Sequence, residues 1–132
     1  MPGLGTVSGF YGEKDQEELY FSFSNYYTPG SLYSFNPDNG SYNIYWKPKI
    51  EFNSSEYTSK QVFYESKDGT KVPYITIYEK GIKPKAQFIY VYGSYGSTTP
   101  INWPYQNWYP LLKRKWAIVF AFVRGGGDVD AA

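Results

Sequence analysis

The chain has 132 residues, of which 42% are hydrophobic and 22% aromatic, so it has the length of one ordinary domain and enough apolar side chains for a core. Lysine and arginine total 13 against 12 aspartate and glutamate residues. This balance provides no net field that would recruit nucleic acid, an anionic membrane or an acidic partner.

The first third of the chain predicts short strands separated by turns. Leu19, Phe21 and Phe23 alternate with more polar residues, which is the period-two pattern of a strand with two different faces. Turn-forming residues such as Pro29-Gly30 and Asn39-Gly40 separate the segments. Strands are therefore expected over residues 5–11, 19–24, 31–35 and 42–46. Four strands at this spacing resemble one β-propeller blade, a unit that normally buries its faces against neighbouring blades.

A boundary between two units is expected where this pattern lapses. Polar residues and Pro48 dominate between Lys47 and Ser59, as in a linker. We therefore assign residues 1–47 to the first unit, 48–59 to a linker and 60–132 to the second unit.

The second unit is expected to begin with a hairpin. Strands are predicted over 61–65 and 72–78, joined by a turn whose Asp68-Gly69 pair is a strong hairpin signal. Pro73 cannot donate a ladder hydrogen bond, so its strand is expected to lie at a sheet edge or to begin near it.

Two nearly continuous apolar runs follow, at 86–92 and 116–123. Such runs are typical of strands buried on both faces of a mostly parallel sheet. Parallel strands need a crossover, and residues 101–115 are long enough for a short helix. Pro104 suits its first turn, whereas Pro110 predicts a break or a fresh start midway. The expected fold class is α/β, with mostly β structure in this chain.

The sequence has neither histidine nor cysteine. A Ser-His-Asp hydrolase takes its proton through imidazole, and most catalytic zinc sites use a histidine, so neither site can be built from these residues alone. No metal or cofactor is expected. The first residues do not predict a secretory signal, and the longest apolar run, Trp116–Val123, is far shorter than the about 20 residues of a membrane helix. We expect a cytoplasmic protein that binds neither membranes nor nucleic acid.

Five segments, taken in order and spacing, give the chain a specific likeness. They are Gly5–Gly9, Pro29-Gly30, Val62–Pro73, Tyr90–Gly96 and Arg124–Asp128. With them the chain resembles the prolyl oligopeptidase family of serine peptidases, including oligopeptidase B, over nearly its whole length. The resemblance implies a β-propeller joined to an α/β-hydrolase domain, with 1–47 as the last propeller strands, 48–59 as the crossing linker and 60–132 as the first part of the hydrolase domain.

The resemblance also implies a role for two tyrosines in peptide-bond hydrolysis by Ser, Asp and His. Tyr92 matches the position of a hydroxyl that donates to the oxyanion, and Tyr95 matches an aromatic residue lining the pocket for the substrate side chain. The alternative is that both are ordinary packing or loop aromatics. Val91 replaces a usual glycine, and a β-branched residue does not readily take positive φ.

The glycine run near the end of the sequence allows two interpretations. It could cradle a phosphate, but no Lys-Ser/Thr pair follows, so a structural turn beside the active site is favoured. The run consists of Arg124, Gly125, Gly126 and Gly127, and Gly93, in the loop after Tyr92, is expected to be a further structural residue near the site. Asp128 and Asp130 could be paired carboxylates or simply solvated.

The nucleophile of such an enzyme is not expected within this sequence. Ser94 and Ser97 do not match a Gly-x-Ser-x-Gly elbow. We therefore expect a piece of an oligopeptidase that is inactive alone and acts on short peptides only with the remainder of its hydrolase and propeller domains. Cleavage after proline and cleavage after basic residues both stay open. An incomplete sheet should leave both faces and an edge uncovered and make the chain aggregation-prone. The alternative is a stand-alone β-rich interaction protein that pairs through its strand edges.

Overall fold

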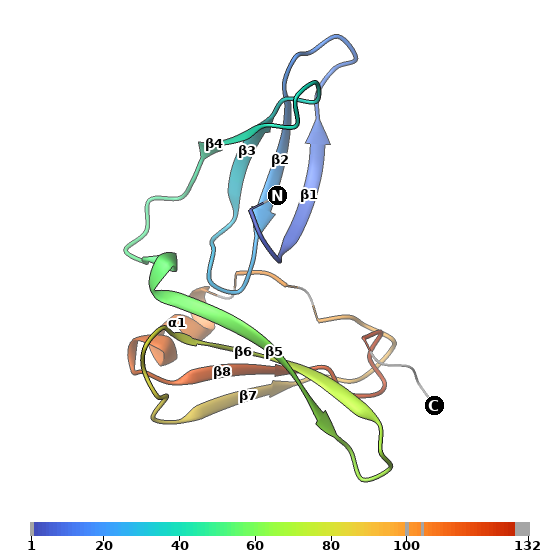
Figure 1. Cartoon of the computed structure of the whole chain (residues 1–132), viewed down its shortest axis with the longest axis vertical. Coiled ribbons are helices and arrows are strands. Elements are labelled where there is room, and N and C mark those ends of the chain that lie inside the picture. Colours follow the sequence, from blue (N-terminus) through green and yellow to red (C-terminus); the bar gives the residue numbers. More distant parts are fainter. Residues whose placement is uncertain (1, 100, 104, 129–132) are drawn as a thin grey trace. The chain divides into compact units, whose positions relative to one another are not determined.

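The computed structural model describes residues 2–99, 101–103 and 105–128, without the side chains of 105–107. The chain divides into two compact units, one formed by residues 1–52 with 101–103 and the other by 53–100 with 104–132. Each contains a four-stranded sheet, and the described part has little helix (Figure 1). The expectation of a mostly β chain is confirmed.

The first unit is an antiparallel meander in which the strands pair in chain order. Three strands have the predicted bounds, and the first begins one residue later than expected. Period-two patterning between turn residues explains this agreement, because both signals are local in the sequence. The strands are β1 (Thr6–Tyr11), β2 (Leu19–Ser24), β3 (Ser31–Phe35) and β4 (Tyr42–Trp46).

Aromatic side chains form the core on one face of this first sheet. Phe21, Phe23 and Tyr33 are buried together, and the rings of Phe21 and Tyr33 stack with centroids 5.2 Å apart. The other face carries hydroxyl groups, among them Ser8 and Ser22, whose Oγ atoms lie 2.6 Å apart. The alternation seen in β2 therefore separates an aromatic face from a polar one.

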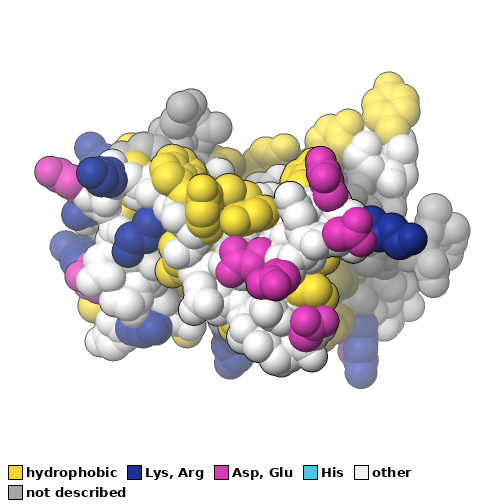
Figure 2. All heavy atoms as spheres, turned by 90° about the horizontal axis from the view of Figure 1, so that it is seen from above, with side chains coloured by type: hydrophobic (Ala, Val, Ile, Leu, Met, Phe, Trp, Pro, Cys, Tyr) yellow, Lys and Arg dark blue, Asp and Glu magenta, His cyan; other side chains and the backbone are white. Residues whose placement is uncertain are grey.

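The outer strand of the first unit leaves large apolar side chains in contact with solvent. Ile44, Tyr45 and Trp46 of β4 are all more than half exposed. Figure 2 shows hydrophobic side chains reaching the surface between charged side chains of both signs. A lone propeller blade was expected to expose such a surface, because a blade normally packs against others.

The second unit contains a mixed sheet in the order β5-β6-β8-β7, so it is not the mostly parallel sheet that was expected. The hairpin strands β5 and β6 are antiparallel, and β6 pairs antiparallel with β8. Only β7 and β8 are parallel, and α1 connects them as a crossover. The elements are η1 (Ser54–Glu56), β5 (Tyr57–Glu65), β6 (Lys71–Glu79), β7 (Gln87–Val91), α1 (Tyr105–Lys113) and β8 (Ala117–Ala121).

Pro73 lies near the start of an interior strand, β6, not of an edge strand. Its carbonyl oxygen accepts a hydrogen bond from the Phe122 amide at 3.1 Å, and the β6–β8 register then runs from Tyr74–Ala121 onward. Because proline has no N–H, it can only accept in this pair. The hydrogen bond that Pro73 cannot donate therefore falls at the end of the β6–β8 ladder. For this reason proline is tolerated in an interior strand.

Pro110 lies inside α1, so the predicted break at this residue is wrong. The helix packs Trp108 against Phe88 and Phe120 of the sheet, with ring centroids 4.8 and 5.7 Å apart, and Leu112 is buried. Tertiary packing of an apolar face stabilises a short helix more than local propensity does, and here it offsets the cost of the proline. The expectation for Pro104 concerns a residue outside the described part.

On one face of the second sheet, α1 packs on β7 and β8, so the expectation that both faces are uncovered is wrong for this part of the sheet. The opposite face forms an open cavity of about 410 Å³ with an aliphatic and aromatic lining. The nine-residue α1 is the longest helix in the described part of the chain, which has no helix with the length and apolarity to cross a bilayer. The cavity residues are Tyr64, Tyr74, Thr76, Gln87, Ile89, Val91, Val119, Ala121 and Val123.

Candidate active-site loops

Two loops leave the sheet at the carboxyl ends of the parallel strands β7 and β8. The strands end in register at Val91 and Ala121, so both loops emerge at the same sheet edge. The loops cover residues 92–99 and 122–128. The amide of Gly96 donates to the carbonyl oxygen of Gly125 at 3.0 Å, and the amide of Gly127 donates to the carbonyl oxygen of Ser97 at 3.2 Å. Main-chain contacts therefore join the two loops.

Glycine is required where the two loop backbones approach each other. A Cβ atom on Gly93 would collide with the carbonyl oxygen of Arg124, and one on Gly125 would lie 2.5 Å from the carbonyl oxygen of Gly93. Gly125 also has a φ of +89°, which favours glycine. Close backbone packing thus accounts for glycine at both positions and supports the structural-turn interpretation.

The side chain of Arg124 points from this loop to the β5–β6 turn. Its guanidinium forms an ion pair with Asp68 and a 3.4 Å hydrogen bond to the Ser66 hydroxyl. Asp68 also accepts a hydrogen bond from the Thr70 amide at 3.1 Å. The Thr70 amide first, and the Arg124 guanidinium second, lower the pKa of the Asp68 carboxyl from 3.8 to about 2.

No sequence pattern predicts this ion pair, because Asp68 is recognisable only as a turn residue. The Asp-Gly signal predicts local backbone geometry and contains no information about a partner 56 positions away. Only the sheet order brings Arg124 beside the turn.

The two tyrosines of the predicted site both lie in the loop that follows β7. Tyr92 is the first residue after the strand and is 43% exposed. Tyr95 is 94% exposed and adopts a left-handed conformation, with a φ of +56°. Val91 is the last strand residue, pairs with Ala121 and is not among the residues with positive φ. Valine therefore fits this position without the strain that its branching would cause in a left-handed turn.

Asp128 has a partner within the loops. Its Oδ2 accepts a hydrogen bond from the Thr99 amide at 3.1 Å, so this carboxylate stabilises the backbone between the two loops. Asp130, with which it could have formed a carboxylate pair, lies outside the described residues. In the described residues, the contact of the Asp128 carboxylate is therefore a hydrogen bond to the main chain.

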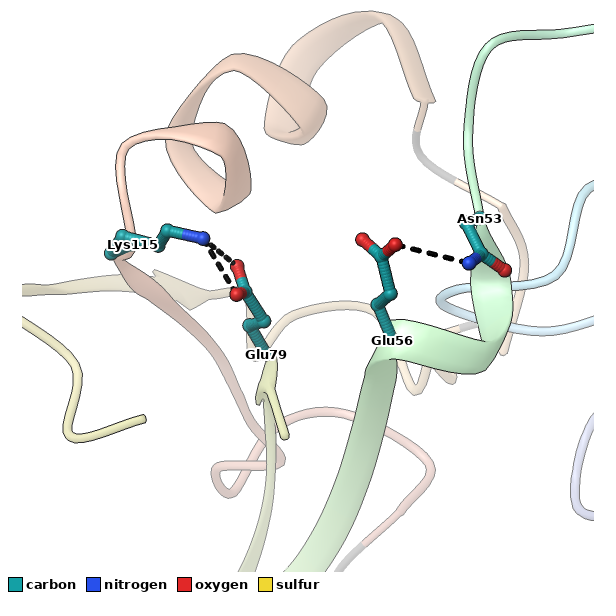
Figure 3. Close-up of polar contacts among 4 residues, drawn as sticks. All are labelled: Asn53, Glu56, Glu79 and Lys115. Carbon is teal, nitrogen blue, oxygen red and sulfur yellow. Dashed lines mark hydrogen bonds and ion pairs between the residues drawn. The ribbon is translucent and has the colours of Figure 1, made fainter. Parts of the chain in front are cut away.

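Other carboxylates of the second unit lie at the opposite end of β6. Figure 3 shows Glu79 directed at Lys115 and Glu56 directed at Asn53. One Glu79 oxygen lies 2.6 Å from the Lys115 Nζ, and the Asn53 amide donates to Glu56 at 3.0 Å. Each of these contacts joins a carboxylate to a donor. Within the described ranges, no group of three or more acidic, histidine or cysteine residues is arranged to hold a metal ion.

Comparison with known proteins places this geometry in a family. The family model of the N-terminal β-propeller domain of prolyl oligopeptidase matches residues 1–48. A prolyl endopeptidase of Elizabethkingia meningoseptica is 39% identical over 133 residues, which cover 97% of this chain and 18% of the relative. One from Dictyostelium discoideum is 33% identical and covers all of this chain and 18% of its own length. A solved prolyl endopeptidase structure matches with a TM-score of 0.80 and 30% identity, over 99% of this chain and 20% of that one.

These matches extend over both units, although the propeller model covers only the first. The proteins that they match are peptidases that carry a β-propeller. The chain belongs to the prolyl oligopeptidase family of serine peptidases. The chain spans about 18% of the length of the curated relatives it matches.

Proposed function

We propose that the chain is part of a serine peptidase that hydrolyses short peptides by Ser-His-Asp acyl transfer. In this proposal residues 1–47 are the last propeller strands, 48–59 the linker and 60–132 the first part of an α/β-hydrolase domain. The observation that carries it is the position of Tyr92, which follows β7 at the carboxyl edge of a parallel strand pair. Sheets of α/β proteins present their functional groups at this edge.

Tyr92 is proposed to donate its hydroxyl hydrogen to the oxyanion of the tetrahedral intermediate. A phenol has a pKa of about 10 and stays protonated at neutral pH. Fixed donors of this kind stabilise charge that develops only in the transition state. Partial exposure of Tyr92 and the backbone contacts that hold its loop support this role. Tyr95 is proposed to line the substrate pocket, because its side chain projects into solvent beside the same loop.

The nucleophile, acid and base are proposed to come from the remainder of the enzyme. This sequence has no histidine, so it cannot supply the base itself. The chain alone is therefore expected to be inactive. Identity of 39–40% with prolyl endopeptidases supports cleavage after proline, while the Gly93–Gly96 segment keeps cleavage after basic residues as the alternative. A cytoplasmic location is part of this proposal and is compatible with the absence of cysteine.

The proposal is tested with peptides that report cleavage after proline or after arginine. The complete enzyme should hydrolyse the proline reporter faster, and the 132-residue chain should hydrolyse neither. Faster cleavage of the arginine reporter would reverse the proposed specificity but keep the reaction. Hydrolysis by the isolated chain, or none by the complete enzyme, would contradict the proposed function.

A second candidate function is that of a stand-alone interaction protein. It is favoured by one observation, the apolar edge strand β7, where Ile89 and Val91 are more than half exposed. Such an edge can accept a partner strand through main-chain hydrogen bonds. This candidate requires an independently stable fold, so a cooperative melt of a monomer would favour it over the peptidase proposal.

A further inference from the structure

We propose that Asp68 and Arg124 are positioning residues that hold the loop of Tyr92 and Tyr95 in place. The Asp68–Arg124 ion pair, here called the brace, would connect the β5–β6 turn to this loop and keep the oxyanion donor Tyr92 in position. The effect on catalysis rests on the proposed function, whereas the mechanical link itself can be measured without any activity.

The first part of the link is the turn, which fixes the Asp68 side chain. The turn is closed by 2.9 Å hydrogen bonds from the Ser66 amide to the Thr70 carbonyl oxygen and from the Gly69 amide to the Ser66 carbonyl oxygen. Asp68 uses Oδ1 to accept from the Thr70 amide and presents Oδ2 to Arg124. One carboxylate oxygen therefore anchors the side chain, and the other contacts the guanidinium.

The second part is the backbone of Arg124 and Gly125. The carbonyl oxygen of Arg124 lies where a Cβ of Gly93 would be, and the carbonyl oxygen of Gly125 accepts from the Gly96 amide. These contacts reach both ends of the segment from Gly93 to Gly96. A displacement of Arg124 would consequently disturb the segment at both ends.

The segment depends on these contacts because its own side chains do not hold it. Tyr95 is 94% exposed, and it has a φ of +56° that residues other than glycine seldom adopt. Such a conformation persists only when surrounding structure determines it. Here the surroundings consist of the glycine loop that follows β8, and Asp68 is the acidic partner of that loop's arginine.

The exposure of the Arg124 and Asp68 side chains sets how much the loss of their ion pair should change the opening of the loop. The side chains of Arg124 and Asp68 are 36% and 47% exposed, so water and salt weaken their attraction. Partly exposed pairs typically change an equilibrium by about two- to fivefold. Breaking the pair should therefore open the loop more often without unfolding the sheet.

The test is limited proteolysis with chymotrypsin, which must extend the chain around Tyr95 before it can cleave there. Cleavage after Tyr11, 74% exposed in the other unit, serves as the internal reference. The variants are Asp68→Asn, which keeps the oxygen that accepts from Thr70, Arg124→Gln, and the two combined. Asp38→Asn, in another exposed turn, is the matched control.

Each single variant should raise the Tyr95-to-Tyr11 cleavage ratio about two- to fivefold, and the double variant should raise it no further. The control should leave the ratio unchanged. An unchanged ratio in either single variant, or multiplied effects in the double variant, would overturn the proposal. An equal rise in cleavage after Tyr74, within β6, would also overturn it, because it would show general unfolding.

A second measurement varies the salt concentration and compares the unmodified chain with the double variant. Salt at about 1 M shortens the screening length to about 3 Å and weakens the ion pair, so it should raise the cleavage ratio of the unmodified chain, by a smaller factor than the single variants do. It should have no such effect on the double variant. Equal salt effects on both chains would contradict a role for the ion pair. If the complete enzyme hydrolysed neither reporter peptide but the cleavage ratios changed as expected, the proposed function would be rejected and the role of the Asp68–Arg124 pair would still be supported.

Discussion

The amide of Gly96 donates to the carbonyl oxygen of Gly125 at 3.0 Å, and this bond joins the loops that follow two parallel strands. The two residues are far apart in the sequence but meet because β7 and β8 end in register. The loop that contains Tyr92, the candidate oxyanion donor, is thus held by main-chain hydrogen bonds to the loop that follows β8. The close contact between the two loop backbones requires glycine at positions 93 and 125, because a Cβ atom there would collide with the opposite loop.

Replacing Gly125 should loosen this contact. Gly125→Ala introduces a Cβ 2.5 Å from the carbonyl oxygen of Gly93 at a φ of +89°, so we expect a loss of about 1–3 kcal/mol in unfolding free energy. Gly30→Ala is the matched control, because nothing lies within 4 Å of its added methyl group. Urea unfolding at low protein concentration measures both. Equal midpoints for the two variants would refute the close-packing account.

The carboxyl group of Asp68 should titrate at unusually low pH. Its pKa is lowered from 3.8 to about 2, so the proton binds more weakly in the folded chain than in the unfolded one. The stabilisation is therefore present above about pH 4 and is lost as pH falls from 3.8 through 2. Carbon-detected NMR of the side chain measures this midpoint.

The same titration separates the two causes of the shift. Arg124→Gln should raise the midpoint only in part, because the Thr70 amide, the larger contribution, remains. A midpoint near 3.8 in the unmodified chain would show that neither contact forms in solution.

The isolated chain should self-associate through its uncovered apolar surfaces. Ile44 on β4 and Ile89 on β7 are each more than half exposed, and both lie on strands at the end of a sheet. Ile44→Lys and Ile89→Lys should each shift sedimentation velocity profiles towards monomer, because charge on an edge strand opposes pairing. Lys60→Arg, which keeps the charge of an exposed β5 residue, is the control. A monomeric unmodified chain with a cooperative melt would contradict this expectation and the proposal that the chain is part of a larger hydrolase.

The bounds of the strands could be predicted from the sequence better than the way in which the strands pair in the sheets. The strands 31–35 and 42–46 were predicted to the residue, because alternation and turn residues are local signals. For Pro73, the second of the two expected positions, near the start of a strand, is confirmed. The break expected at Pro110 is wrong, because packing of α1 against the sheet offsets the cost of the proline. Two parallel apolar strands with a helical crossover were expected and found. The sheet is mixed, however, because β6 runs antiparallel to β8, and β7 is an exposed edge strand, so the expectation that both strands are buried on both faces is wrong for β7.

For the candidate site, motifs predicted roles for Tyr92, Tyr95 and the glycine loops, but did not indicate the side chain that links the loops to the hairpin. The pairing of Arg124 with Asp68 follows from the order β5-β6-β8-β7, which no local pattern contains. Long-range ion pairs of this kind are recognisable only once the sheet is assembled.

The proposed role of Tyr92 is tested most directly by the turnover number of the complete enzyme with Tyr92→Phe. Loss of one oxyanion donor should lower kcat about 10²- to 10³-fold while leaving KM nearly unchanged. Tyr90→Phe is the matched control, because Tyr90 packs its ring against Trp108 and Phe120 and should keep that contact. Unchanged kcat in Tyr92→Phe, or equal losses in both variants, would contradict the account.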